Sequence, residues 1–132
     1  MGKPTVLMFG MAGETGRAWR MTAMRLGIFI RMIDGAREEQ SLSELLGAQD
    51  TRESDAGAMD WEEPMMVMAH FRPGMLDAFL TGARRLGAPR IELKAVLTQS
   101  NAGWTARRLF EELRAERAAF RQGTSEHEPK ER

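Results

Sequence analysis

Cysteine and tyrosine are both missing from this chain of 132 residues. Without cysteine, disulfide bonds, thiolate nucleophiles and cysteine-ligated metal sites are excluded. Long apolar runs are missing too: the run from Thr5 to Phe9 is too short for a membrane span or the core of a signal peptide. We therefore expect a soluble protein with no membrane segment. The lack of cysteine is compatible with a cytoplasmic location.

Excess charge of either sign is also absent. Nineteen basic residues balance nineteen acidic ones, and this argues against a nucleic-acid partner bound through bulk electrostatics. The pair Arg84-Arg85 and the mixed charges of residues 107–121 indicate solvated helix faces. With 42% apolar and 29% charged residues, the composition is that of a globular protein, and the length fits one domain.

Two halves of the chain repeat one pattern, a buried strand followed by a helix, then a second strand and a second helix. Segments 6–8 and 66–68 match in residue type, as do 24–27 and 84–87, each pair sixty positions apart. We expect a single domain over 1–122, with repeats at 1–47 and 64–122, an acidic loop at 48–63 and a flexible tail at 123–132. The predicted strands are 5–9, 28–33, 65–71 and 91–98, and the predicted helices are 15–26, 38–46, 73–86 and one capped by Ser100 or Asn101.

This order of elements predicts an α/β fold, a small three-layer sandwich built from two βαβα repeats. The four strands are expected to be mostly parallel, in the order 2-1-3-4, with the first strands of the two repeats adjacent and running the same way. The alternative is a ferredoxin-like α+β sheet, in which the two halves interleave antiparallel. The continuous apolar runs of the first and third strands favour the parallel arrangement.

A distinctive stretch lies in the second half. Residues 91–98 read IELKAVLT and are followed by Asn101, Trp104 and the segment 109–112. Through these residues and the helix before them, residues 64–120 resemble the bacterial family DUF3783, a domain of unknown function. The first half resembles more loosely, through residues 42–47, the region that precedes this domain in longer members. Gln99 departs from the family pattern, which has proline there. The resemblance implies a fold class and no activity.

Glycines at positions 10, 13 and 16 follow the first predicted strand and open a helix, and Asp34 ends the second strand. The spacing is similar to a variant dinucleotide-binding fingerprint, in which glycines admit a pyrophosphate and an acid binds the ribose. The alternative function is therefore an NAD- or NADP-binding enzyme or redox sensor that uses Gly10, Gly13, Gly16 and Asp34. Against it, Glu14 brings negative charge to the phosphate position. A tight turn, capped by the two residues after Gly13, explains the glycines without a cofactor.

A crevice follows if the first and third strands are parallel neighbours. The glycine turn would then lie beside His70 and Arg72 at the carboxyl ends of the strands, where open parallel sheets bind ligands. Lys94, Thr98, Asn101 and Trp104 form a second cluster, which is either a polar pocket or a set of caps and packing contacts. The candidate ligand-binding residues are Gly10, Gly13, Thr15, His70, Arg72, Lys94, Thr98, Asn101 and Trp104.

No residue order indicates a catalytic nucleophile, and His70 and His127 are too far apart to suggest a metal site. In the acidic loop, Met59 and Trp61 are expected to anchor the loop on the protein's own surface rather than on a partner. The favoured function is a non-catalytic binding or regulatory module, without a cofactor, that recognises a protein partner or a small anion. The identity of that partner and the oligomeric state are left open.

Overall fold

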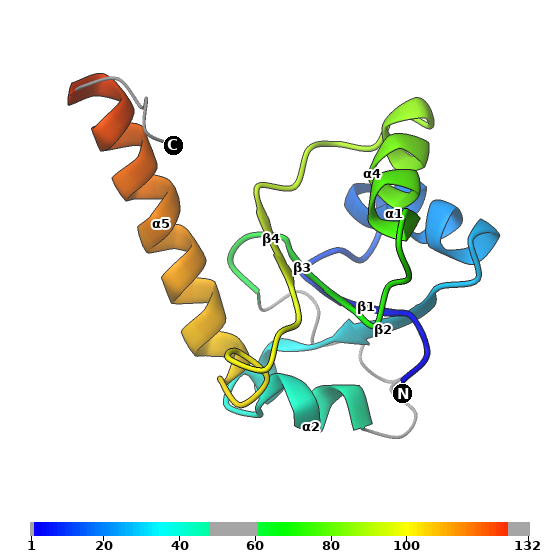
Figure 1. The fold of residues 1–132 in the computed structure, drawn as a ribbon, viewed down its shortest axis with the longest axis horizontal. Helices are drawn as coiled ribbons and strands as arrows, with labels where there is room; N and C mark the ends of the chain where they lie inside the picture. The colour runs from blue at the N-terminus through cyan, green and yellow to red at the C-terminus, as the bar shows by residue number, and fades with distance from the viewer. Residues whose placement is uncertain (1, 48–60, 127–132) are drawn as a thin grey trace.

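A four-stranded sheet with helices on both faces forms the centre of the computed structural model, which describes residues 2–47 and 61–126 (Figure 1). The strands lie in the order β2-β1-β3-β4, as predicted. They are β1 (Thr5–Phe9), β2 (Phe29–Ile33), β3 (Met65–Ala69) and β4 (Leu93–Val96). The helices are α1 (Glu14–Arg25), the 3-10 turn η1 (Gly35–Arg37), α2 (Leu42–Gly47), α4 (Met75–Arg85) and α5 (Ala106–Glu126).

The direction of one strand pair differs from the prediction. β2 is parallel to β1 and β4 is parallel to β3, but β1 and β3 are antiparallel, with Leu7 opposite Val67. The expected parallel pairing of the first and third strands is therefore wrong. Both strands are buried on both faces because helices cover both faces, so their apolar runs carry no information about direction. The halves lie side by side, which also differs from the interleaved ferredoxin-like alternative.

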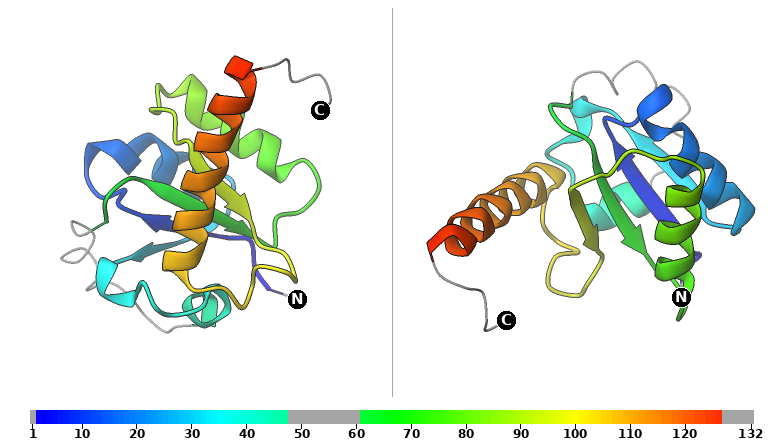
Figure 2. Two further views of the ribbon diagram at one scale, coloured as in Figure 1. Left: turned by 90° about the vertical axis from the view of Figure 1, so that its left-hand side faces the viewer. Right: turned by 90° about the horizontal axis from the view of Figure 1, so that it is seen from above.

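Alternating residues of the central strands supply two apolar cores. Leu7 and Phe9 of β1 pack on one side with α2 and the first turns of α5, and Trp61 joins this cluster. Val6 and Met8 point the other way, into a cluster with α1 and α4. Figure 2 shows the same division, with α5 crossing one face of the sheet and slanting away from it toward its C-terminal end. Among the described helices, none has the length and apolarity that a membrane span needs.

A twofold relation connects the halves. Leu7 and Val67, which face each other at the centre of the β1–β3 pair, are sixty positions apart. α1 and α4, which lie on the same face of the sheet, end in the same way. The Ile28 N–H donates to the Ala23 carbonyl after α1, and the Ala88 N–H donates to the Ala83 carbonyl after α4. Residue i of the first half therefore corresponds to residue i + 60 of the second as far as the helix ends.

The correspondence breaks after α4. Phe29 of β2 lies opposite Thr5, 24 positions later in the chain, whereas Leu93 of β4 lies opposite Met65, 28 positions later. The second half thus carries four extra residues between its helix and its second strand. We name residues 89–92 the β4 extension. It is the point along the chain where the correspondence between the two units first breaks.

Several element boundaries differ from the prediction. Residues 38–41 are not helical: α2 begins at Leu42 behind a capping box, in which the Ser41 hydroxyl accepts from the Glu44 N–H and the Glu44 carboxylate accepts from the Ser41 N–H. The last helix is capped by Thr105 rather than by Ser100 or Asn101. That helix continues to Glu126. Residues 127–132 of the predicted tail lie outside the described chain.

Candidate anion-binding site

The predicted crevice does not form, because the antiparallel β1–β3 pair separates its two sides. The glycine turn after β1 lies at the end of the sheet where β3 begins, whereas His70 follows the other end of β3, opposite Thr5. His70 lies beside the N-terminal segment instead, since a Cβ atom on Gly2 would overlap the imidazole ring. Arg72 is exposed in the segment that follows. The twofold relation of the halves thus places these two residues far from the glycine turn.

The glycine turn is explained by its own geometry. Gly10 and Gly13 have φ angles of 67° and 74°, and a Cβ atom on Gly16 would overlap the Met11 carbonyl. Arg20 ties the turn by donating to the carbonyl oxygens of Met11 and Gly13, at 2.7 and 3.2 Å. These contacts support the structural alternative for all three glycines.

Side-chain capping of α1 was predicted and is wrong. The helix begins at Glu14 with Gly13 as its N-cap, and no side chain forms a cap hydrogen bond. Glu14 instead pairs with Arg17 at 3.7 Å, and Thr15 is partly buried in the first turn. Asp34 follows β2, which is parallel to β1, so it does lie at the same end of the sheet as the glycine turn. That is the part of the dinucleotide fingerprint that the fold retains.

Two residues of the second predicted cluster, Thr98 and Asn101, close a turn. The Asn101 side-chain oxygen accepts from the Thr98 N–H at 2.9 Å, and the Thr98 hydroxyl accepts from the Asn101 N–H at 3.1 Å. Trp104 packs against the core that contains Phe110, with the Arg108 guanidinium 4.0 Å from its ring centroid. Thr98, Asn101 and Trp104 therefore serve the structure, which leaves Lys94 apart from them.

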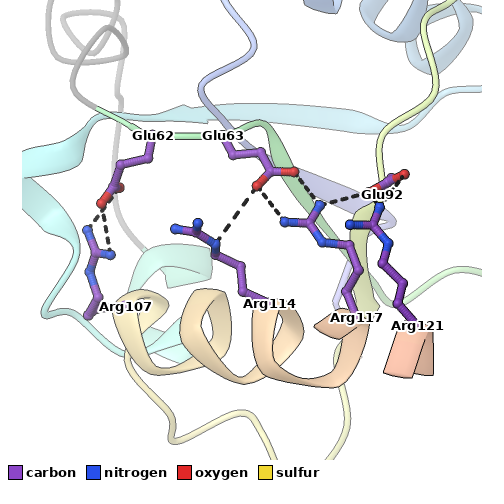
Figure 3. Close-up of polar contacts among 7 residues, drawn as sticks. All are labelled: Glu62, Glu63, Glu92, Arg107, Arg114, Arg117 and Arg121. Atoms are coloured by element: carbon purple, nitrogen blue, oxygen red, sulfur yellow. Dashed lines mark hydrogen bonds and ion pairs between the residues drawn. The ribbon is translucent and has the colours of Figure 1, made fainter. Parts of the chain in front are cut away.

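Paired charges hold α5 to the body of the protein (Figure 3). The Arg107 guanidinium donates to the carboxylates of Glu38 and Glu62, and the Arg117 guanidinium donates to those of Glu63 and Glu92. Glu92 also accepts from Arg121. Because α5 slants away from the sheet, long arginine side chains span the widening distance. The acidic residues at the end of the predicted 48–63 loop are thus used inside the chain.

Trp61 packs on the protein's own core, as predicted. Its ring is 6% exposed and lies 4.9 Å from the Phe9 ring and 5.1 Å from the Phe110 ring, centroid to centroid. Met59 and the rest of residues 48–60 lie outside the described chain. The indole N–H of Trp61 is buried and has no hydrogen-bond partner among the described residues. This contact closes the core beneath α5.

A pocket of about 380 Å³ lies beside the β4 extension, between α4 and the start of β4. Trp19, Leu80 and Ile91 supply apolar walls. The Trp19 indole N–H donates to the Pro89 carbonyl at 3.0 Å, which fixes the extension against α1. The four extra residues of the second half therefore build this pocket. We call it the cationic pocket because of the side chains described next.

Three cationic side chains line the cationic pocket: Arg84 from α4, Arg90 from the extension and Lys94 from β4. The Lys94 ammonium donates to the Ile91 carbonyl at 2.6 Å, which holds it toward the extension. Partial burial lowers the pKa of Lys94, the positive charge of Arg90 and Arg84 lowers it further, and Glu92 acts in the opposite direction. Positive charge is therefore concentrated here beyond what the neighbouring acid neutralises.

The two arginines of the cationic pocket differ from the arginines of α5 in their ion pairing. Arg107, Arg117 and Arg121 are all ion-paired, whereas Arg84 and Arg90 form no ion pair with any residue of the described ranges. Both are exposed. Sequence reasoning identified Lys94 but assigned Arg84 to a solvated helix face. The signal that it missed is the four-residue difference in spacing between the two halves.

The comparison with known families finds a match in the second half of the chain. Residues 64–120 match the family described as Domain of unknown function (DUF3783). The match spans β3, α4, β4 and most of α5, so it contains all three cationic side chains of the pocket but not Trp19. No curated protein and no solved structure gives a significant match.

Proposed function

We propose that this protein is a binding module for small anions and that the cationic pocket is its site. One observation carries the proposal: Arg84, Arg90 and Lys94 line the same pocket of about 380 Å³, and the two arginines have no carboxylate partner in the described chain. Pockets of this size are typical of small-molecule sites. The proposal keeps the small-anion function expected from the sequence and moves it to the amino end of β4.

Electrostatics favours an anion at this position. Like charges that converge raise the free energy of the empty pocket, and a bound anion removes that repulsion. Guanidinium groups offer forked donors that match carboxylate or phosphate oxygens, and the Lys94 ammonium adds a compact charge. The hydrogen bonds from Trp19 to Pro89 and from Lys94 to Ile91 hold the walls in place before binding.

Thermal unfolding at constant ionic strength tests the proposal. Inorganic phosphate, sulfate, acetate, ATP, NAD and NADP would each be added to the full chain, with chloride balancing the ionic strength. A ligand at one hundred times its Kd adds about 2.7 kcal/mol to the free energy of unfolding, which raises the melting temperature by several degrees. We expect at least one of the simple anions to stabilise the protein.

Charge-removing variants locate the effect. Lys94→Gln and Arg90→Gln should abolish it. Arg25→Gln, which removes an exposed charge of α1 outside the pocket, should preserve it. No stabilisation by any anion, or stabilisation that survives Lys94→Gln, would contradict the proposal. Stabilisation by NAD or NADP alone that Gly13→Val removes would instead establish the dinucleotide alternative. A bacterial source and a cytoplasmic location stay predictions from the sequence.

A further inference from the structure

A second depression adjoins the cationic pocket. It has a volume of about 290 Å³ and lies between the first half of α1 and the end of α4. Pro89 lines both depressions, so the two share a wall formed by the β4 extension. We call this second depression the α1–α4 groove. The two depressions therefore lie next to each other, with Pro89 between them.

The α1–α4 groove is apolar where the pocket is charged. Its surface includes Ala18, Met21 and Leu86, and the latter two side chains are 40% and 39% exposed. The two charged residues at its rim, Glu14 and Arg17, pair with each other at 3.7 Å. They therefore offer no uncompensated charge to a ligand, and exposed apolar area is what remains.

We propose that the ligand is an organic phosphate monoester with an apolar substituent. This inference rests on the anion site proposed above. The phosphate occupies the cationic pocket, and the substituent crosses Pro89 into the α1–α4 groove. A phosphate dianion suits three converging cations better than a carboxylate, because it carries more charge and accepts from several donors at once. The exposed Met21 and Leu86 side chains gain burial when the substituent covers them.

Calorimetric titration of the full chain separates the two parts of this ligand. The probes are inorganic phosphate, glycerol 1-phosphate, hexyl phosphate and hexanoate. We expect hexyl phosphate to bind at least about tenfold more tightly than glycerol 1-phosphate, since several methylene groups leave water. We also expect hexyl phosphate to bind more tightly than hexanoate, which carries a comparable chain on a monoanionic head.

Matched methionine variants test the groove. Met21→Ser should remove the advantage of hexyl phosphate over glycerol 1-phosphate and leave the binding of inorganic phosphate unchanged. Met24→Ser changes a residue of the same helix that is 70% exposed and lines neither depression, so it should leave all affinities as they were. Circular dichroism checks that both variants fold.

The outcomes distinguish this inference from the anion site on which it rests. If all the phosphates bind with equal affinity and Lys94→Gln abolishes binding, the anion site stands and the apolar substituent is wrong. If hexanoate binds as well as hexyl phosphate, the phosphate assignment is wrong. If the gain from the hexyl chain survives Met21→Ser, the groove is not where the chain lies. If none of the probes binds, both proposals fail.

Discussion

The rings of Trp19 and Phe79 lie 5.3 Å apart, centroid to centroid, at an interplanar angle of 60°. These residues are sixty positions apart and occupy matching places on α1 and α4, so each ring packs on its own counterpart. Their side chains are 5% and 0% exposed. The contact joins the two halves on the face of the sheet that α1 and α4 cover. Leu7 and Val67 join them within the sheet.

Removing one of these rings should be costly. Phe79→Ala is expected to lower the free energy of unfolding by about 3–5 kcal/mol, because it leaves a cavity where the two halves meet. That is a large share of the roughly 5–15 kcal/mol that stabilises a typical domain. Urea denaturation followed by circular dichroism measures the change. Met24→Ala, at an exposed site of α1, should stay within about 0.5 kcal/mol of the parent protein. A loss below about 1 kcal/mol for Phe79→Ala would mean that the ring contact is not what joins the halves.

The glycine turn gives a prediction about folding rather than binding. Gly16→Ala should destabilise the protein by about 1–3 kcal/mol, because the new methyl group overlaps the Met11 carbonyl. Gly47→Ala serves as the control: nothing lies within 4 Å of its added methyl group, and alanine favours a helix, so no loss is expected. Unfolding in urea without any ligand measures both. An unchanged stability for Gly16→Ala would show that Gly16 is not required by packing.

The docking of α5 should weaken in acid. A hydrogen bond from Arg117 lowers the pKa of the Glu63 carboxyl, and one from Arg107 lowers the pKa of the Glu62 carboxyl, each from an ordinary value of 4.5. As pH falls, the unfolded chain therefore takes up these protons before the folded protein does. The stabilisation is complete above pH 4.5 and is lost as pH drops through the lowered pKa values.

Urea denaturation at a series of pH values measures this dependence. Arg117→Gln should flatten the fall in stability toward low pH, since Glu63 then titrates near its ordinary pKa. Arg108→Gln is the matched control, because that guanidinium stacks on Trp104 and forms no ion pair with a carboxylate of the described chain. Equal pH dependence in the parent protein and Arg117→Gln would show that the α5 pairs do not contribute.

His70 occupies a conformation that suits glycine. Its φ angle is 63°, and the matching residue of the first half is Gly10, with φ of 67°. A left-handed backbone costs a residue with a side chain roughly 1–2 kcal/mol, partly offset by the greater chain entropy that glycine loses on folding. His70→Gly should therefore raise the free energy of unfolding by up to about 1 kcal/mol.

A second substitution separates the backbone from the imidazole. His70→Ala removes the side chain but keeps the strained conformation, so thermal and urea unfolding should show no gain. If His70→Gly and His70→Ala are equally destabilised, contacts of the imidazole ring outweigh the strain. That result would also give His70 a structural role that its position beside Gly2 does not by itself establish.

Much of the architecture was predictable from residue patterns. The strand order follows from the two repeats, and the edge position of β2 follows from Arg31, which interrupts its apolar run. The direction of β3 relative to β1 was not predictable, because strands buried on both faces show the same apolar run in either direction. The expected crevice depended on that direction and was lost with it.

The candidate site was visible only in part. The sequence marks Lys94 as a polar residue of the fourth strand, but residue order places it with Thr98 and Asn101, which close a turn of their own. Arg90 and Arg84 become neighbours of Lys94 through the path of the β4 extension, which periodicity does not reveal. Aligning the two halves at Gly27 and Gly87 shows the four extra residues in the sequence itself.

The four-residue extension also sets a stoichiometry. In the first half, one residue separates Gly27 from Phe29, where β2 begins, so no matching loop exists there. The proposed anion site therefore occurs once in a fold of two similar units. Saturation is expected at one equivalent per chain, with a single class of affinity, despite the duplicated framework.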